Sequence, residues 1–241
     1  MPTQNRSTQR TPRPPRKGIR PATARQPADQ STRGRLSRQQ WIDAALLLIA
    51  QQGLSGVNIA NMAAALRVTT GSFYWHFGSR EELIEAALDR WETERIDVIE
   101  GLREIADPRQ RLERLISDSY RHGDRGRLFA ALQASASDPR VASRLRRTTQ
   151  RRLTFLTQTY RQLGHSLPQA RHYALSLYSL YAGLWEVART LPSSDEHAPT
   201  GRQLTGYLQH LRKLILPAAP TAAPTSALAS VHGGSTGSTS R

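Results

Sequence analysis

The 241-residue chain contains no cysteine, which excludes disulfides, thiolate metal sites, thiol redox switches and cysteine nucleophiles. Its longest uninterrupted apolar run, Ala44 to Ala50, is far shorter than the ~20 residues that a membrane-spanning helix requires. The N-terminal segment also lacks the apolar stretch of a secretory signal. These absences predict a protein that stays in the cytoplasm and has no membrane partner.

Lysine is nearly absent as well, with two Lys against 32 Arg, a bias that a GC-rich genome alone would produce. The formal net charge is nonetheless +15 at pH 7. Such a charge favours a polyanionic partner, nucleic acid first and an anionic membrane surface second. Because the arginine bias has this second explanation, charge alone does not define a function.

Composition and periodicity divide the chain into three stretches. Residues 1–35 are dense in Pro, Gln, Thr and Arg, with nine basic residues and one acid, and are predicted to form a disordered basic arm. Residues 217–241 are mostly Ala, Pro, Ser, Thr and Gly and predict a second disordered segment. Between them, helical periodicity without strand-like alternation predicts an all-α fold.

Capping residues mark the expected helix starts in the first half of this fold. The candidates are Ser37, Asn58, Thr69 and Ser79. Ser37 with Gln40, and Ser79 with Glu82, have the spacing of capping boxes. They predict a first helix that stops at Gly53, two short helices, and a long helix running to about Ala106.

The second half predicts a bundle of further amphipathic helices. Their expected ranges are 109–132, broken near Gly123 and Gly126, then 139–164, 169–191 and 201–216. The last two have the most regular apolar stripes, and these stripes match each other.

A short helix, a turn, another short helix and a capped long helix form the layout of a helix-turn-helix, whose second helix enters the major groove of DNA. Here that helix lies in the stretch 68–77. Phe73 and Phe77, at i and i+4, can anchor it to the core, leaving small polar side chains outward. The candidate DNA-binding residues are Thr69, Thr70, Gly71, Ser72, Tyr74, Trp75, His76 and Arg80.

This order of small polar residues, aromatics and helix cap resembles the TetR/AcrR family of transcriptional regulators. The resemblance covers residues 37 to about 90. It implies that Thr70, Ser72 and Trp75 face base edges, while Tyr74, His76 and Arg80 contact the DNA backbone. Two departures are Arg67, where the family turn usually has glycine, and Ala60, where some members carry a longer base-reading side chain.

The resemblance further implies a helix-turn-helix DNA-binding domain at 36–82 and a helical-bundle domain at 83–216 for effector binding and dimerisation through the last two helices. The expected function is a ligand-responsive repressor that binds an inverted-repeat operator in double-stranded DNA as a homodimer. Repression is the family default. The basic arm could contact DNA or be a solvated tail.

Five aromatic residues on expected inner stripes are candidates for lining a small-molecule effector cavity: Tyr120, Phe129, Phe155, Tyr178 and Trp185. Ordinary core packing is the alternative for each of them. A row of Arg144, Arg147 and Arg151 on one helix face could meet an anionic effector, although such rows are more often solvated.

Other classes of function have less support in the sequence. The stretch 233–237 matches the G-x-S-x-G pattern of hydrolases but has no strand before it or helix after it, so no enzyme is expected. His165 and His172 lack a carboxylate at ligand spacing, so neither a metal nor a cofactor is expected. A protein that coats nucleic acid without sequence preference remains an alternative, distinguished by its loss of binding to any competitor DNA.

Overall fold

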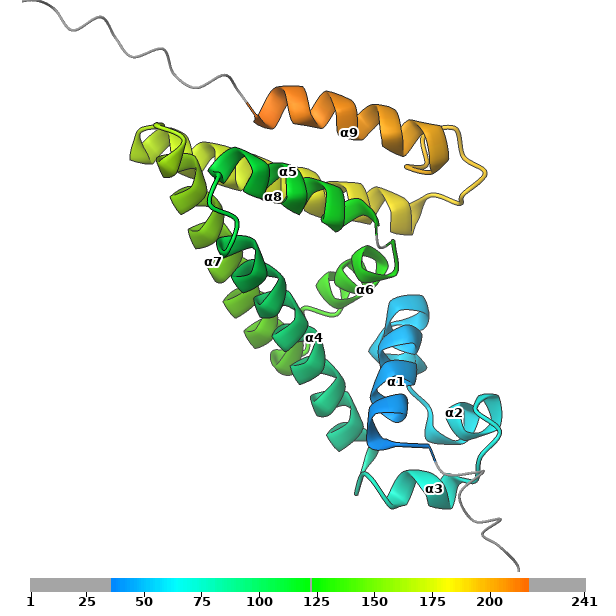
Figure 1. Cartoon of the computed structure of the whole chain (residues 1–241). Coiled ribbons are helices and arrows are strands. Elements are labelled where there is room, and N and C mark those ends of the chain that lie inside the picture. The colour runs from blue at the N-terminus through cyan, green and yellow to red at the C-terminus, as the bar shows by residue number, and fades with distance from the viewer. Residues whose placement is uncertain (1–35, 122, 217–241) are drawn as a thin grey trace, which may run out of the picture. The chain divides into compact units, whose positions relative to one another are not determined.

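The computed structural model describes residues 36–121 and 123–216, and within these residues the chain is helical without a strand, which confirms the all-α prediction. The helices are α1 (Arg38–Gln52), α2 (Ile59–Ala65), α3 (Thr70–Tyr74), α4 (Arg80–Arg103), α5 (Pro108–Arg121), α6 (Gly123–Ala134), α7 (Pro139–Gln162), α8 (Leu167–Thr190) and α9 (Gly201–Ile215) (Figure 1). A single 3₁₀ turn over Leu54–Gly56 follows α1. The predictions for the basic arm and the C-terminal tail lie outside the described residues.

The first three helices form a small unit whose boundaries follow the capping signals. The predicted capping box between Ser37 and Gln40 is present, and Asn58 accepts a hydrogen bond from the backbone N–H of Asn61. Gly53 has a φ of 72°, which ends α1 in a conformation that glycine adopts without strain. These local signals fix where α1 and α2 begin and end.

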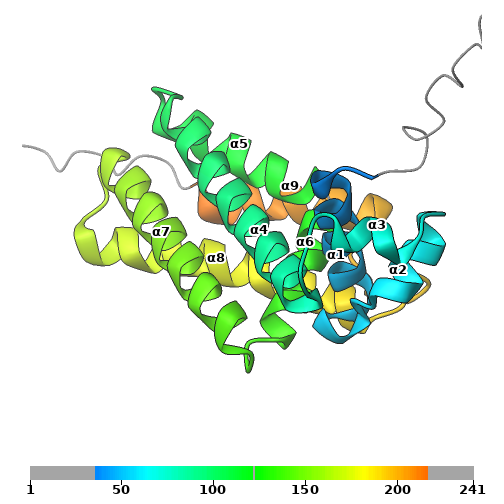
Figure 2. The same ribbon diagram turned by 90° about the horizontal axis from the view of Figure 1, so that it is seen from below.

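The remaining helices pack as a bundle joined to this unit by α4. In both Figure 1 and Figure 2, α4 and α7 run side by side, and α8 packs against α7. Helix α1 packs on both α4 and α6, and α9 lies against α5 and α8. Because α4 begins only a few residues after α3 and extends along the bundle, it links α3 to the bundle.

Three local expectations were wrong. The long helix ends at Arg103 and not at about Ala106. Ser79 caps α4, but the Glu82 carboxylate accepts a hydrogen bond from the backbone N–H of Gly78 and not from that of Ser79. The reciprocal half of this capping box therefore does not form. Thr69 precedes α3 without a side-chain cap bond.

The break near Gly123 and Gly126 is present, with α5 ending at Arg121 and α6 beginning at Gly123. Gly126 lies within α6, where this helix contacts α8. A Cβ placed on Gly126 would lie 1.9 Å from the Trp185 ring, so only glycine lets α6 approach α8 this closely. Within the described residues, no helix is apolar and long enough to cross a bilayer, and no group of His, Asp and Glu side chains is arranged to hold a metal ion.

Candidate functional site: a DNA-facing helix and an arginine-lined cavity

The back of α3 is held by aromatic packing. Phe73 and Phe77 are buried and stack with ring centroids 5.5 Å apart, and Phe73 meets the edge of Trp41 from α1 at 5.4 Å. The Arg38 guanidinium lies 4.6 Å from the centroid of the Phe77 ring. A helix of only five residues has little stability of its own, so this packing is what fixes its orientation.

The front of α3 is open to solvent. Thr69, Thr70 and Gly71 are exposed at its N-terminal end. Tyr74 and Trp75, at the other end, are 64% and 72% exposed. Two neighbouring large aromatic side chains with this exposure give the face the character of a binding surface.

Ser72 does not belong to that exposed face, which does not favour the contact with base edges expected for it. Its side chain is 6% exposed, and its hydroxyl has no hydrogen-bond partner among the described residues. The physical reason is that α3 is only five residues long and packs against α2, so a small side chain next to the buried Phe73 is covered by the same packing.

His76 and Arg80 use their side chains inside the domain, which does not favour the phosphate contacts expected for them. His76 Nε2 donates to the Leu36 carbonyl oxygen at 2.7 Å, and a carbonyl only accepts, so this nitrogen carries a proton. Arg80 donates from Nε to the Val57 oxygen and from Nη2 to the Leu54 oxygen, both at 2.6 Å. Arg80 therefore ties the start of α4 to the connection between α1 and α2.

Arg67 has a φ of 56° in the turn between α2 and α3, the left-handed conformation that the sequence indicated would be costly there. Its side chain is exposed. This exposed cation beside α3 was not among the predicted DNA-binding residues, since the sequence marked it only as a departure in the turn.

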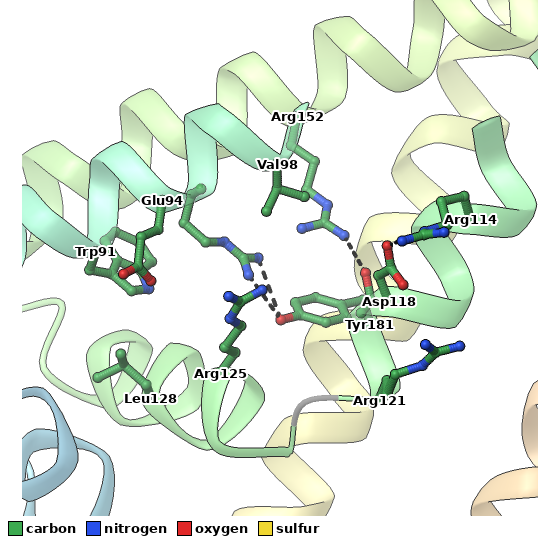
Figure 3. Close-up of a pocket in the computed structure, with 12 residues that line it drawn as sticks. Trp91, Glu94, Val98, Arg114, Asp118, Arg121, Arg125, Leu128, Arg152 and Tyr181 are labelled. Atoms are coloured by element: carbon green, nitrogen blue, oxygen red, sulfur yellow. Dashed lines mark hydrogen bonds and ion pairs between the residues drawn. The ribbon is translucent and has the colours of Figure 1, made fainter. Parts of the chain in front are cut away.

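The bundle contains a cavity of about 330 Å³ bordered by residues of α4, α5, α6, α7 and α8 (Figure 3). Its apolar lining includes Trp91, Val98, Leu128 and Tyr181. Five arginines and two acids also line it: Arg95, Arg114, Arg121, Arg125 and Arg152, with Glu94 and Asp118. The cavity is therefore cationic overall.

Two of these arginines meet at one aromatic ring. The Arg152 guanidinium lies 4.8 Å from the Tyr181 ring centroid, and that of Arg95 lies 5.6 Å from it. Arg95 also donates to the Tyr181 hydroxyl at 3.4 Å, and Arg152 donates to Ser119 Oγ at 2.9 Å. Burial and the neighbouring Arg95 charge lower the pKa of Arg152 to about 10. This buried cation therefore lacks adequate compensation in the structure.

None of the five predicted effector-binding aromatics lines this cavity. Tyr120, Phe129 and Trp185 pack with Tyr181 in a buried cluster, in which the Tyr120 and Trp185 rings stack at 6.4 Å. Phe129 and Tyr178 border only a small space next to Arg95 and Arg152.

Phe155 is also buried, beneath the Arg103 guanidinium. Packing against other side chains therefore explains the aromatic residues at these five positions better than direct contact with a ligand in this cavity.

Two arginines of the predicted row on α7 pair with acidic side chains of α4, which does not favour an effector site there. Arg144 is buried and donates to Glu85 and Asp89 of α4 at 2.6 and 2.5 Å, and Arg147 pairs with Glu92 at 2.5 Å. Arg151 is exposed. The arginines that sequence reasoning missed are Arg95 and Arg152, although Arg152 occupies a core position of the α7 stripe with Arg144, Thr148 and Phe155.

A short exposed helix anchored behind a tight turn, followed by a long helix leading into a bundle, defines a helix-turn-helix DNA-binding protein. The family described as "Bacterial regulatory proteins, tetR family" matches residues 42–87. The regulator named BetI from Paraburkholderia phymatum is 29% identical over 159 residues, which are 61% of this chain and 79% of that protein.

Two solved structures share the fold. A transcriptional regulator from Rhodococcus superposes with a TM-score of 0.61 at 22% identity, over 75% of this chain and 96% of that one. A regulator from Saccharomonospora viridis in complex with choline gives 0.60 at 22% identity, over 74% and 95%. Residues 42–87 therefore form a helix-turn-helix of the TetR family, and the chain is similar to DNA-binding transcriptional regulators of that family.

Proposed function

We propose that this protein is a repressor that binds an inverted-repeat operator as a homodimer and releases it when a small molecule occupies the cavity of the bundle. The observation that carries the DNA-binding half is the open face of α3, with Thr70 at one end and Tyr74 and Trp75 at the other. In this proposal Thr69, Thr70, Gly71 and Trp75 face the bases. Tyr74 and the exposed Arg67 contact phosphates.

Exposed apolar side chains on the last two helices support the dimer. Leu175 and Val187 of α8 are 55% and 40% exposed, and Leu214 of α9 is 55% exposed. An apolar groove beside them is lined by Leu180, Leu184 and Val187 of α8 together with Tyr207 of α9. A single helix-turn-helix reads few base pairs, so two copies on half-sites ~34 Å apart give useful specificity.

The cavity supports the ligand response. Residues of α4, including Trp91 and Arg95, line it, and α4 begins directly after the DNA-facing helix. A ligand that prefers one position of α4 changes the spacing of two α3 helices in a dimer. Coupling of this kind is typically worth ~1–3 kcal/mol. The choline in the Saccharomonospora viridis regulator belongs to that protein, and the cationic lining described above argues against the same ligand here.

Selection of bound fragments from genomic DNA, followed by quantitative binding to the recovered site, tests the DNA-binding proposal. Thr70→Val and Trp75→Ala should change which sequence is preferred. Tyr74→Phe should weaken binding about equally for all sequences. Ser72→Ala is the matched control, because this buried hydroxyl should leave the preference unchanged. A symmetric operator bound by two copies supports the repressor model.

If competitor DNA of any sequence abolishes binding equally, the protein coats nucleic acid without specificity and the proposal is wrong.

A further inference from the structure

We infer that the cavity binds a small organic anion, a carboxylate with an apolar body, whose charge is held between Arg95 and Arg152. This inference rests on the proposed ligand response and specifies the chemical class of the ligand. Three observations support it. Arg152 is a buried cation without a carboxylate partner among the described residues, and the acidic side chains nearby are already paired with other arginines. The cavity also has the size and the apolar lining for a small organic molecule.

Arg152 is the central observation. It is 8% exposed, and the charged or titratable neighbours that act on it are Arg95 and the tyrosines Tyr120, Tyr178 and Tyr181. Burial raises the pKa of Tyr120, so this tyrosine stays neutral and supplies no negative charge. Within the described residues, Arg152 has no ion pair with a carboxylate. A buried guanidinium is usually paired, because an uncompensated charge in a low-dielectric interior is costly.

The acidic side chains that line the cavity already have arginine partners. Glu94 pairs with Arg90 at 2.5 Å, one turn earlier on α4, and Asp118 accepts from Arg114 at 2.6 Å on α5. Neither acid forms an ion pair with Arg95 or Arg152 among the described residues. Figure 3 shows Arg125 reaching from α6 towards the Tyr181 hydroxyl, which adds a third guanidinium at the same end of the cavity.

Tyr181 argues against a cationic ligand. A quaternary ammonium ion needs a free aromatic face, and here the guanidinium groups of Arg95 and Arg152 both lie over the Tyr181 ring. A second cation would meet two like charges. A carboxylate would instead accept hydrogen bonds from guanidinium groups that are already held in position, and planar guanidinium groups suit this geometry.

The remainder of the cavity fits an apolar body. Trp91, Val98 and Leu128 also line it, and its volume of about 330 Å³ is at the lower end of typical small-molecule sites. An aromatic acid or a short alkyl acid therefore matches both parts of the lining better than a bare inorganic anion does.

Calorimetric titration of the full-length protein with a set of matched probes tests this inference. The probes are benzoate, phenylacetate, hexanoate and octanoate, the corresponding uncharged amides, and choline. At least one carboxylate should bind at least tenfold more tightly than its amide, and choline should not bind. The inference is wrong if no carboxylate binds more tightly than its amide, or if choline binds more tightly than every carboxylate.

Substitutions then locate the binding. Arg152→Met and Arg95→Gln should each weaken the best carboxylate at least tenfold and its amide less than twofold. Arg151→Met removes an exposed arginine from the same helix and should change neither. Arg95→Gln serves as the second variant if Arg152→Met does not fold. Unchanged carboxylate affinity in a folded Arg95 or Arg152 variant overturns the assignment.

Operator binding measured with and without the carboxylate separates this inference from the proposed function. Carboxylate binding that leaves operator affinity unchanged supports the anion site and contradicts the ligand response. If a probe weakens operator binding but no carboxylate binds more tightly than its amide, the ligand response is supported and the anion site is contradicted.

Discussion

Helices α4 and α7 carry two groups of arginines that differ in what lies opposite them. In the first group, Arg144 and Arg147 face Glu85, Asp89 and Glu92 across the interface. In the second, the guanidinium groups of Arg95 and Arg152 both lie over the Tyr181 ring and have no carboxylate partner among the described residues. Both groups consist of arginines. An arginine that pairs with a carboxylate of the protein stabilises the fold, whereas an arginine without such a partner can bind an anionic ligand.

The two groups also respond differently to burial. Burial lowers the pKa of Arg144, but hydrogen bonds to Asp89 and Glu85 outweigh it and hold this pKa above its ordinary value. No such compensation acts on Arg152, whose pKa falls to about 10. Positions 144 and 152 both lie on the buried stripe of α7, so the difference comes from α4 and not from α7 itself.

The largest change in stability is expected when the ion pairs of the first group are removed. Arg144→Met should lower the free energy of unfolding by about 2 kcal/mol, because it removes a buried guanidinium that joins α7 to two carboxylates of α4. The cost stays below that of a fully buried pair since Glu85 and Asp89 remain 40% and 65% exposed. Urea unfolding followed by circular dichroism measures it.

Arg151→Met is again the control, and a surface substitution of this kind should change stability by less than about 0.5 kcal/mol. An Arg144 variant as stable as this control would show that the ion pairs between α4 and α7 contribute nothing measurable.

The unpaired group should respond in the opposite direction. Without ligand, Arg152→Met should raise the free energy of unfolding by about 1 kcal/mol, because it replaces an uncompensated buried cation with an apolar side chain of similar length. Thermal unfolding of the ligand-free protein measures this change. A clear loss of stability would mean that the bond to Ser119 and the packing on Tyr181 make Arg152 a structural residue.

The sequence predicted the elements that depend on local signals. The cap at Ser37, the stop at Gly53, the break before Gly126 and the strained turn at Arg67 are all present, since each depends on residues within a few positions of one another. The family resemblance pointed to α3 as the candidate DNA-facing helix for the same reason, because the pattern that carries it is contiguous.

The sequence could not distinguish the functions of side chains whose partners lie far along the chain. Ser72 was placed outward, but its position depends on how α3 packs against α2. Arg80 was assigned to phosphate, but its acceptors are carbonyl oxygens 23 and 26 residues earlier. Arg152 escaped notice because the absence of a carboxylate opposite it becomes visible only once α4 and α7 are paired.

The smallest expected effect concerns a further ion pair, at the start of α7, where Asp138 caps the helix and pairs with Arg140 at 2.7 Å. Hydrogen bonds from the Arg140 side chain lower the pKa of Asp138 to about 2, although burial opposes them. Asp138→Asn retains a cap acceptor but loses the charge, and should cost about 0.5 kcal/mol at neutral pH.

Because the folded-state pKa of Asp138 lies below the ordinary value of 3.8, the carboxylate contributes stability above about pH 4 and loses it as the pH falls towards 2. The stability difference between the wild type and this variant should therefore disappear over that interval in unfolding measurements made at successive pH values, and a difference that persists at pH 2 would assign the effect to the cap and not to the ion pair.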